Sequence, residues 1–251
     1  MSLYYSLPRG DNWNYQPKVK NNFKLSRSKL ELFTQCPRCF YLDNRLGLKR
    51  PPGYPFNLNT AVDHLLKKEF DLHRAKNKTH PLMKRYGLKL KPFAHPELDT
   101  WRENFKGIQY HHQKTDLTVS GAVDDIWVDK QGYLYVVDYK STSKNESITQ
   151  LNQEWQIGYK RQMEVYQWLL RQNGFKVSDK GYFVYCNGRT DVEAFDGKLE
   201  FEVNLIEHIG DDSWVEQAII DAHKCLNKKS LPQSGKDCDY CLYRKMVGEV
   251  E

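Results

Sequence analysis

The sequence predicts an α/β protein with a central mixed β-sheet flanked by helices. Two observations support this fold class. A β-branched section broken by turns occupies the middle of the chain, and amphipathic helical stretches lie on both sides of it. From residue 117 to residue 205 the expected order is strand, strand, helix, strand, strand, which is typical of a mixed sheet with helices on its faces.

Helices are predicted at several places. Ser26 or Ser28 can cap the first helix, which should end near Cys36 because Pro37 follows it. Further helices are expected at about 58–76, 96–110, 153–172 and 211–227. The helix at 58–76 should place four apolar side chains on one side: Val62, Leu65, Leu66 and Phe70.

Strands are predicted at 117–128 and 133–140, joined as a hairpin by a turn at 129–132, and again at 180–186 and 199–205. Residues 1–25 are expected to form a polar arm, and residues 26–251 a single domain with cysteine-rich ends.

The composition sets broad limits on function. The 251 residues carry a net charge of +6, which is compatible with a polyanionic partner but is also common in proteins without one. No apolar run approaches the ~18 residues of a membrane span, and the N-terminus does not have the pattern of a signal peptide. We therefore expect no membrane association and a cytoplasmic location.

Two aspartates and a lysine are predicted to converge at the hairpin. Asp138 and Lys140 share a face of the second strand, and Asp124 can lie beside them on the first. Carboxylates hold Mg²⁺ well, and a nearby ammonium can orient a water molecule and offset phosphate charge. The backbone carbonyl of Tyr139 is a natural additional oxygen ligand. This set suits phosphodiester hydrolysis with one or two metal ions.

A structural explanation of the same residues stays open. An Asp-x-Lys triplet is expected about once by chance in a chain of this length. A second one, Asp196-Gly-Lys198, occurs at a glycine turn and is interpreted as a hairpin loop. Asp138 differs because an apolar strand leads into it.

Three more polar residues are candidates. Gln162 and Tyr166 lie four apart on one helical face, where a packed aromatic stripe is the structural alternative. His64 lies on the helix at 58–76, where a lone histidine is more often a surface or core residue.

In this order the motifs resemble the RecB-like branch of the PD-(D/E)XK nuclease superfamily. The matching elements are His64, Gly121-x-x-Asp124, Asp138-Tyr-Lys140 and Gln162-x-x-x-Tyr166, and the resemblance covers roughly residues 26–245. One departure is Thr60, where relatives often carry glycine.

The resemblance implies a restriction-endonuclease-like core and specific residue roles. His64, Asp124, Asp138 and the Tyr139 carbonyl would bind Mg²⁺ or Mn²⁺, and Lys140 would be the catalytic lysine. Gln162 and Tyr166 would position DNA and the active site. Asp125 competes with Asp124, but the family pattern places the ligand at the third residue after the glycine.

Two C-x-x-C pairs, Cys36/Cys39 and Cys238/Cys241, lie near opposite ends of the chain. Thiolates in fours suit an iron–sulfur cluster or Zn²⁺. The family resemblance, to the nucleases of CRISPR adaptation and of helicase–nuclease complexes, implies a [4Fe–4S] cluster joining the two ends of the fold. The usual third C-terminal cysteine is absent, so a Zn²⁺ site stays an alternative. Cys186 is expected to be buried, and Cys225 is ambiguous.

The expected function is that of a metal-dependent deoxyribonuclease, an exonuclease or flap-type enzyme acting on single-stranded DNA ends. The alternative is a nucleic-acid-binding, weakly active subunit of a larger assembly for DNA repair, recombination or CRISPR-type processing. A purely structural zinc or redox protein would explain the cysteines but leave Asp124, Asp138 and Lys140 without a role.

Overall fold

The computed structural model describes residues 14–17, 23–53 and 57–251. The chain divides into two compact units. We call residues 55–108 and 121–212 the sheet unit, and residues 1–54, 109–120 and 213–251 the terminal unit. Most of the expected polar arm, residues 1–13 and 18–22, lies outside the described residues. The single-domain organisation of 26–251 stays a prediction.

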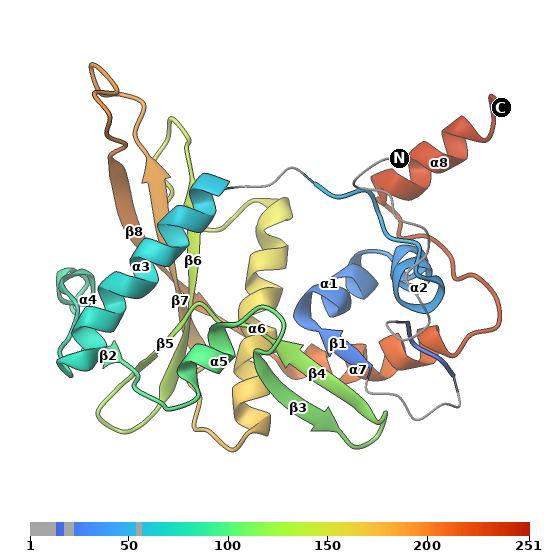
Figure 1. The fold of residues 1–251 in the computed structure, drawn as a ribbon, viewed down its shortest axis with the longest axis horizontal. Helices are drawn as coiled ribbons and strands as arrows, with labels where there is room; N and C mark the ends of the chain where they lie inside the picture. The colour runs from blue at the N-terminus through green and yellow to red at the C-terminus, as the bar shows by residue number, and fades with distance from the viewer. Residues whose placement is uncertain (1–13, 18–22, 54–56) are drawn as a thin grey trace. The chain divides into compact units, whose positions relative to one another are not determined.

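The sheet unit contains a mixed five-stranded sheet in the order β2-β5-β6-β7-β8 (Figure 1). The central pair, β6 and β7, is parallel, and the other neighbours are antiparallel. The strands are β2 (Lys91–Pro92), β5 (Asp125–Val128), β6 (Leu134–Thr142), β7 (Lys180–Gly188) and β8 (Phe201–Ile209).

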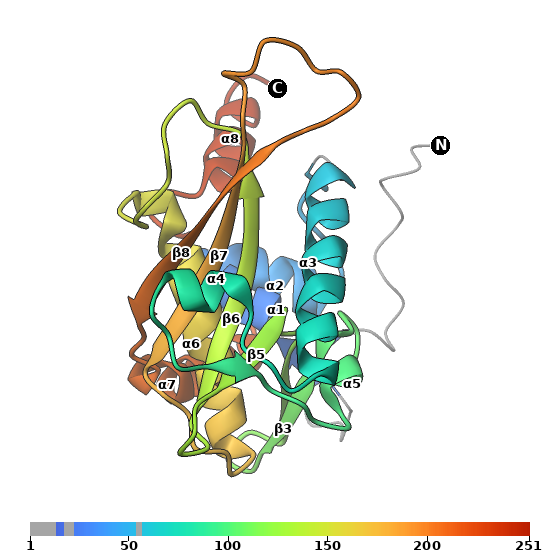
Figure 2. The same cartoon turned by 90° about the vertical axis from the view of Figure 1, so that its left-hand side faces the viewer.

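Helices cover both faces of this sheet. Figures 1 and 2 show α3 (Asn57–Ala75) along one face and α6 (Ile157–Gln172) along the other. Val137 and Tyr139 of β6 join Phe70 of α3 in the buried core. Because side chains alternate along a strand, Asp138 and Lys140 point to the opposite face, toward α6. Two short helices, α4 (Pro81–Arg85) and α5 (Leu98–Arg102), complete the unit.

Local sequence explains the boundaries nearest the site. The β5–β6 hairpin turns at Asp129, whose carboxylate accepts hydrogen bonds from the backbone N–H groups of Gln131 and Tyr133, both at 2.9 Å. A 3₁₀ turn (Glu154–Gln156) leads into α6, which ends at Gln172 with Asn173 as its C-cap. Gly174 follows with a φ of 84°, a left-handed conformation that glycine adopts without strain.

The terminal unit contains a three-stranded sheet, β1-β4-β3, and four helices among the residues described there. The strands are β1 (Lys24–Ser26), β3 (Ile108–His112) and β4 (Leu117–Gly121). The helices are α1 (Arg27–Gln35), α2 (Pro37–Leu46), α7 (Ser213–Leu226) and α8 (Asp239–Val247). Ser26 caps α1 by accepting a hydrogen bond from the Lys29 N–H.

The expected α/β class is confirmed, and so are the first helix, the hairpin, the long helix before Asn173 and the last strands. Two predictions were wrong. The helix expected at 96–110 is only α5, because Gly107 adopts a φ of 64° and β3 begins at Ile108. The strand expected at 117–128 breaks at residues 122–124, so that β4 and β5 belong to different sheets.

Smaller differences concern helices and burial. The helices α2 and α8 were not predicted. Leu65, expected on the apolar side of α3, is 64% exposed, whereas Phe70 is buried. Cys186 and Cys225 are both buried. No helix among the described residues is long and apolar enough to cross a membrane.

Candidate functional site

Asp138 and Lys140 form an ion pair on the α6 face of β6. Lys140 Nζ lies 2.5 Å from Asp138 Oδ2, and the Asp138 side chain is fully buried. Burial acts to lower the pKa of Lys140, but the carboxylates of Asp138 and Asp124 outweigh this effect and hold the pKa above its ordinary value. The lysine therefore carries its positive charge across the neutral pH range.

Two residues of α6 continue this polar chain. Lys140 Nζ donates to Gln162 Oε1 at 3.4 Å, and Gln162 Nε2 donates to the Tyr166 hydroxyl at 3.1 Å. Gly121 explains the close approach of Tyr166, because a Cβ on Gly121 would lie 2.6 Å from the Tyr166 ring. The structure thus brings Lys140, Gln162 and Tyr166 together, although the buried Tyr166 ring also packs as a core residue would.

Asp124 immediately precedes the first residue of β5 and lies beside β6. Its Oδ2 accepts a hydrogen bond from the Tyr139 N–H at 2.9 Å. The N–H and carbonyl of a strand residue point to the same side, so the Tyr139 carbonyl also faces the side of Asp124. The β5–β6 ladder ends at the pair Asp125–Val137, so it does not reach Tyr139. A carboxylate and a backbone carbonyl therefore share this edge.

Asp125 has a different role from its neighbour. It is fully buried and paired with Arg74 and with Arg102, the latter at 2.9 Å. Its Oδ2 accepts a hydrogen bond from the Tyr139 hydroxyl at 2.9 Å. Burial, and next the Asp125 charge, raise the pKa of Tyr139 well above its ordinary value. Asp125 therefore holds the core together, and Asp124 is the aspartate left at the edge.

Among the described residues, His64 does not form a cluster of close ligand atoms with Asp124 and Asp138. His64 is exposed on α3, and no described residue forms a hydrogen bond or ion pair with it. Lys67, one turn further along α3, places Nζ 3.5 Å from Asp124 Oδ1 and 2.8 Å from Asp63 Oδ2. Lys67 was not among the residues predicted from the sequence, although the i,i+4 spacing of Asp63 and Lys67 was a visible signal.

The donor atoms at this edge suit a hard divalent cation. The carboxylates of Asp124 and Asp138 and the carbonyl of Tyr139 are all oxygen ligands, which Mg²⁺ and Mn²⁺ prefer over sulfur or nitrogen. The ammonium groups of Lys67 and Lys140 compensate the two carboxylates here. The residues present therefore fit the predicted ion in chemical type.

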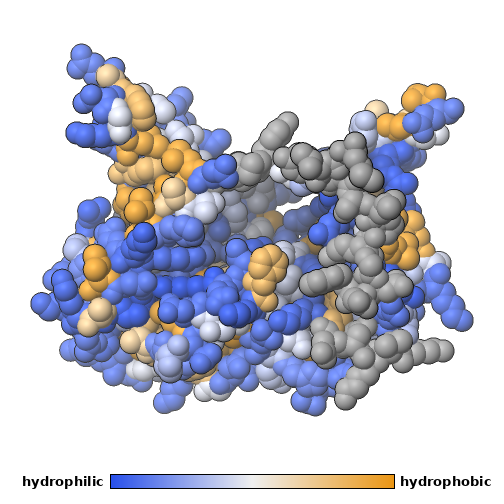
Figure 3. All heavy atoms as spheres, viewed as in Figure 1, coloured by the Kyte–Doolittle hydropathy of each residue, from blue (hydrophilic) through white to orange (hydrophobic). Residues whose placement is uncertain are grey.

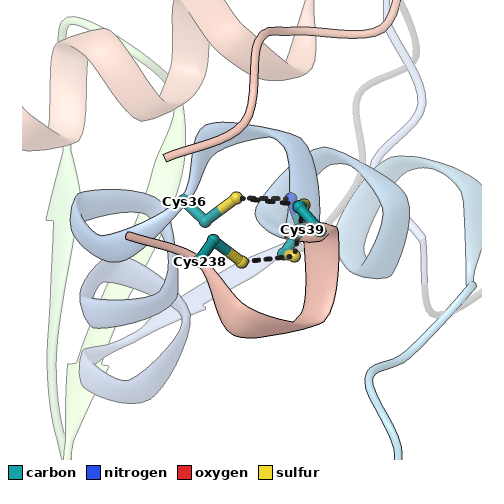
Figure 4. A group of neighbouring side chains, drawn as sticks. Cys36, Cys39 and Cys238 are labelled. Carbon is teal, nitrogen blue, oxygen red and sulfur yellow. Dashed lines mark hydrogen bonds between the residues drawn. The ribbon is translucent and has the colours of Figure 1, made fainter. Parts of the chain in front are cut away.

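The four paired cysteines form a second site, within the terminal unit. Cys36 and Cys39 lie at the junction of α1 and α2, while Cys238 and Cys241 lie at the start of α8. Figure 4 shows Cys36, Cys39 and Cys238 turned toward one another. All four Sγ atoms lie within 4.8 Å of one another. The expected joining of N- and C-terminal segments by a cysteine metal site is thus supported.

The thiols differ in their surroundings. Burial acts to raise the pKa of Cys36, but backbone N–H groups of Gly235 and Cys39 donate to its sulfur and bring the pKa down to about 6. Burial raises the pKa of Cys39, and burial together with contacts to the other three thiols raises that of Cys241. The four sulfurs lie close together, and thiolates of this kind are ligands that soft metal ions prefer.

Comparison with known proteins assigns the chain to a nuclease superfamily. The family model of the PD-(D/E)XK nuclease superfamily matches residues 57–246. The chain belongs to this superfamily and is a metal-dependent nuclease by family. Among solved structures, the crystal structure of SSO0001 is similar, with 16% sequence identity, 91% of this chain and 87% of that chain covered, and a TM-score of 0.35. No curated protein matches the chain.

Proposed function

We propose that this protein is a deoxyribonuclease that hydrolyses phosphodiesters at single-stranded DNA ends, as an exonuclease or flap-type enzyme, with Mg²⁺ or Mn²⁺. The observation that carries the proposal is the polar chain Asp138–Lys140–Gln162–Tyr166, which links one face of β6 to α6. Asp124 and the Tyr139 carbonyl lie at the adjoining strand edge.

Each residue has a role in this proposal. Asp124, Asp138 and the Tyr139 carbonyl would hold the ion, which would supply an activated water and offset charge on the phosphate. Asp138 keeps Lys140 charged, so that Lys140 donates to the attacking water or to a phosphate oxygen. Gln162 orients the Lys140 ammonium by accepting its hydrogen bond, and the Tyr166 hydroxyl orients Gln162 by accepting a hydrogen bond from its amide.

His64 is the fourth proposed ligand, and it needs a separate test because it forms no tight ligand cluster with the aspartates among the described residues. If His64 binds the ion, His64→Ala should raise the Mg²⁺ concentration required for half-maximal activity while leaving the melting temperature unchanged. Lys67→Ala is the matched variant, since Lys67 contacts Asp124 directly. If Lys67→Ala raised the required Mg²⁺ concentration and His64→Ala did not, His64 would not be a metal ligand.

A second function is favoured by one surface feature. The loop between β7 and β8 exposes Val192, Phe195 and Leu199, and Figure 3 shows hydrophobic side chains gathered over this part of the sheet unit. Exposed apolar patches often bind proteins. The alternative is therefore a weakly active subunit that works within an assembly for DNA repair, recombination or CRISPR-type processing.

The deciding experiment is incubation of the purified chain with end-labelled single-stranded, double-stranded and flapped DNA, in Mg²⁺, Mn²⁺ or EDTA. We expect cleavage of the substrates with single-stranded ends in either ion and none in EDTA. A circular single-stranded substrate separates end-dependent from internal cleavage. Robust cleavage in EDTA would contradict the mechanism, and binding without cleavage would favour the subunit alternative.

A further inference from the structure

We propose that Cys36, Cys39, Cys238 and Cys241 bind one tetrahedral zinc ion and not an iron–sulfur cluster. The sulfur–sulfur distances are 3.7 Å for Cys36–Cys241, 3.6 Å for Cys39–Cys238 and 3.6 Å for Cys39–Cys241. A tetrahedron with Zn–S bonds of about 2.3 Å has sulfurs about 3.8 Å apart. The observed spacing matches that of ligands around a single ion.

A [4Fe–4S] cluster requires a wider arrangement. Each of its four cysteines binds a different iron, so the ligand sulfurs lie roughly 6 Å apart around the cluster. The whole sulfur set here lies within 4.8 Å, which leaves no room for such a cluster between the thiolates. The cluster implied by family resemblance therefore does not fit this site.

Neighbouring donors suit the charge of a zinc–tetrathiolate centre, which is −2. The Gly235 N–H donates to Cys36 Sγ at 3.2 Å, and Arg50 donates to Cys238 Sγ at 3.3 Å. The Arg50 guanidinium also stacks over the Tyr240 ring at 4.6 Å, which fixes its position. Hydrogen bonds to ligand atoms of this kind orient the ligands and offset their charge.

Gly235 allows the C-terminal segment to approach the first helix. A Cβ at this position would lie 2.1 Å from the carbonyl oxygen of Gln35, so any other residue would push the segment away from Cys36. The four-sulfur site therefore depends on this close backbone contact. Because the unfolded chain has no preformed site, the binding energy of the ion contributes directly to folding of the terminal unit.

Elemental analysis of the full chain, purified anaerobically, tests this proposal. We expect one zinc per chain, no absorbance near ~400 nm, and visible d–d bands of a tetrahedral thiolate site when Co²⁺ replaces zinc. About four irons per chain with absorbance near ~400 nm would overturn the proposal, as would one iron per chain or the absence of any metal.

Variants provide a second readout. Cys238→Ser should reduce the zinc content and lower the melting temperature, whereas Cys186→Ser changes a buried cysteine outside the cluster and should keep the zinc. Gly235→Ala should weaken zinc retention against a competing chelator. Gly53→Ala is its control, because nothing lies within 4 Å of a Cβ there. Equal zinc retention by both glycine variants would contradict the role given to Gly235.

A different observation supports an inference that rests on the proposed function. Trp155 is 59% exposed in the turn before α6, and its ring meets Tyr159 edge-on at 5.6 Å. The Lys140 ammonium lies over the Tyr159 ring, 4.5 Å from its centroid. We infer that Trp155 stacks on an unpaired nucleobase of the strand whose phosphate reaches Lys140. Stacking on an exposed indole suits single-stranded DNA, whose base faces are free.

Binding and kinetics test this inference separately. Trp155→Ala should raise the KM for single-stranded DNA about 10-fold with little change in kcat, and Trp155→Phe should restore much of the loss. Phe105→Ala is the control, because Phe105 is 94% exposed on another segment. Binding of 2-aminopurine-labelled single strands in EDTA reports stacking even if cleavage fails. Unchanged binding and KM in Trp155→Ala would overturn the inference.

Discussion

Lys140 places its ammonium between the carboxylate of Asp138, 2.5 Å away, and the ring of Tyr159, whose centroid lies at 4.5 Å. Both neighbours favour the charged lysine, the first by ion pairing and the second through its π-face. A buried charge held in this way is costly to desolvate and loses its compensation when one partner is removed. A chance Asp-x-Lys triplet with both side chains exposed at the surface therefore does not explain this buried pair.

Asp138→Asn is expected to lower the rate of metal-dependent DNA cleavage by at least about 10²–10³-fold, because a ligand charge and the partner of Lys140 are lost together. Single-turnover cleavage of labelled DNA measures the effect. Asp196→Asn is the matched control, since Asp196 lies in the exposed β7–β8 loop with a φ of 42° that asparagine also tolerates. If Asp196→Asn lost activity and Asp138→Asn did not, the wrong triplet has been chosen.

The two adjacent aspartates are expected to differ in role, Asp124 in cleavage and Asp125 in folding stability. Asp124→Asn should abolish cleavage with little change in the free energy of unfolding. Asp125→Asn should lower that free energy by about 3–5 kcal/mol, because it leaves Arg74 and Arg102 without their buried carboxylate. Denaturant unfolding and cleavage assays on both variants measure this difference. The reverse pattern would assign Asp125 to the metal.

Gly121→Ala should impair cleavage by displacing Tyr166, because the new methyl group would lie 2.6 Å from Cε1 of its ring. The shift should reach Gln162, which hydrogen-bonds the Tyr166 hydroxyl. Gly188→Ala is the control, since its nearest neighbours lie at an ordinary 3.6 Å. Cleavage kinetics and melting temperature should both be measured. Normal kinetics in a strongly destabilised Gly121→Ala would mean that Tyr166 is only a core residue.

His80 should make the fold less stable at acidic pH. Burial holds the pKa of His80 below its ordinary value of 6.5, although the contact with Glu69 acts in the opposite direction. The unfolded chain therefore binds a proton more readily, and the free energy of unfolding should decrease as pH falls below about 6.5.

His80→Asn tests this pH dependence. Asparagine can still cap α4, as the His80 ring does by accepting from the Leu82 N–H, but it does not titrate. Chemical denaturation of wild type and His80→Asn between pH 5 and pH 8 should show a shallower pH dependence for the variant. Parallel curves would contradict the prediction.

The sequence alone determined the fold class and most of the motif positions. The apolar strand before Asp138, the glycine turn at 129–132 and the end of α6 at Asn173 are local signals, because strand alternation and turn chemistry depend on neighbouring residues. Such patterns placed Asp138 and Lys140 on one face. The spacing of the two C-x-x-C pairs predicted a metal site but could not separate zinc from a cluster.

Only the tertiary structure decided sheet membership, helix length and the roles of neighbouring residues, because these depend on segments distant in sequence. The break at 122–124 sends β4 and β5 into different sheets, and α5 is short because Gly107 turns the chain. Asp124 and Asp125 are adjacent in sequence, yet only the packing of Arg74 and Arg102 around Asp125 distinguishes their roles. Likewise Lys67, not His64, reaches Asp124, because the position of a helix over a sheet is fixed by side-chain packing that sequence spacing does not record.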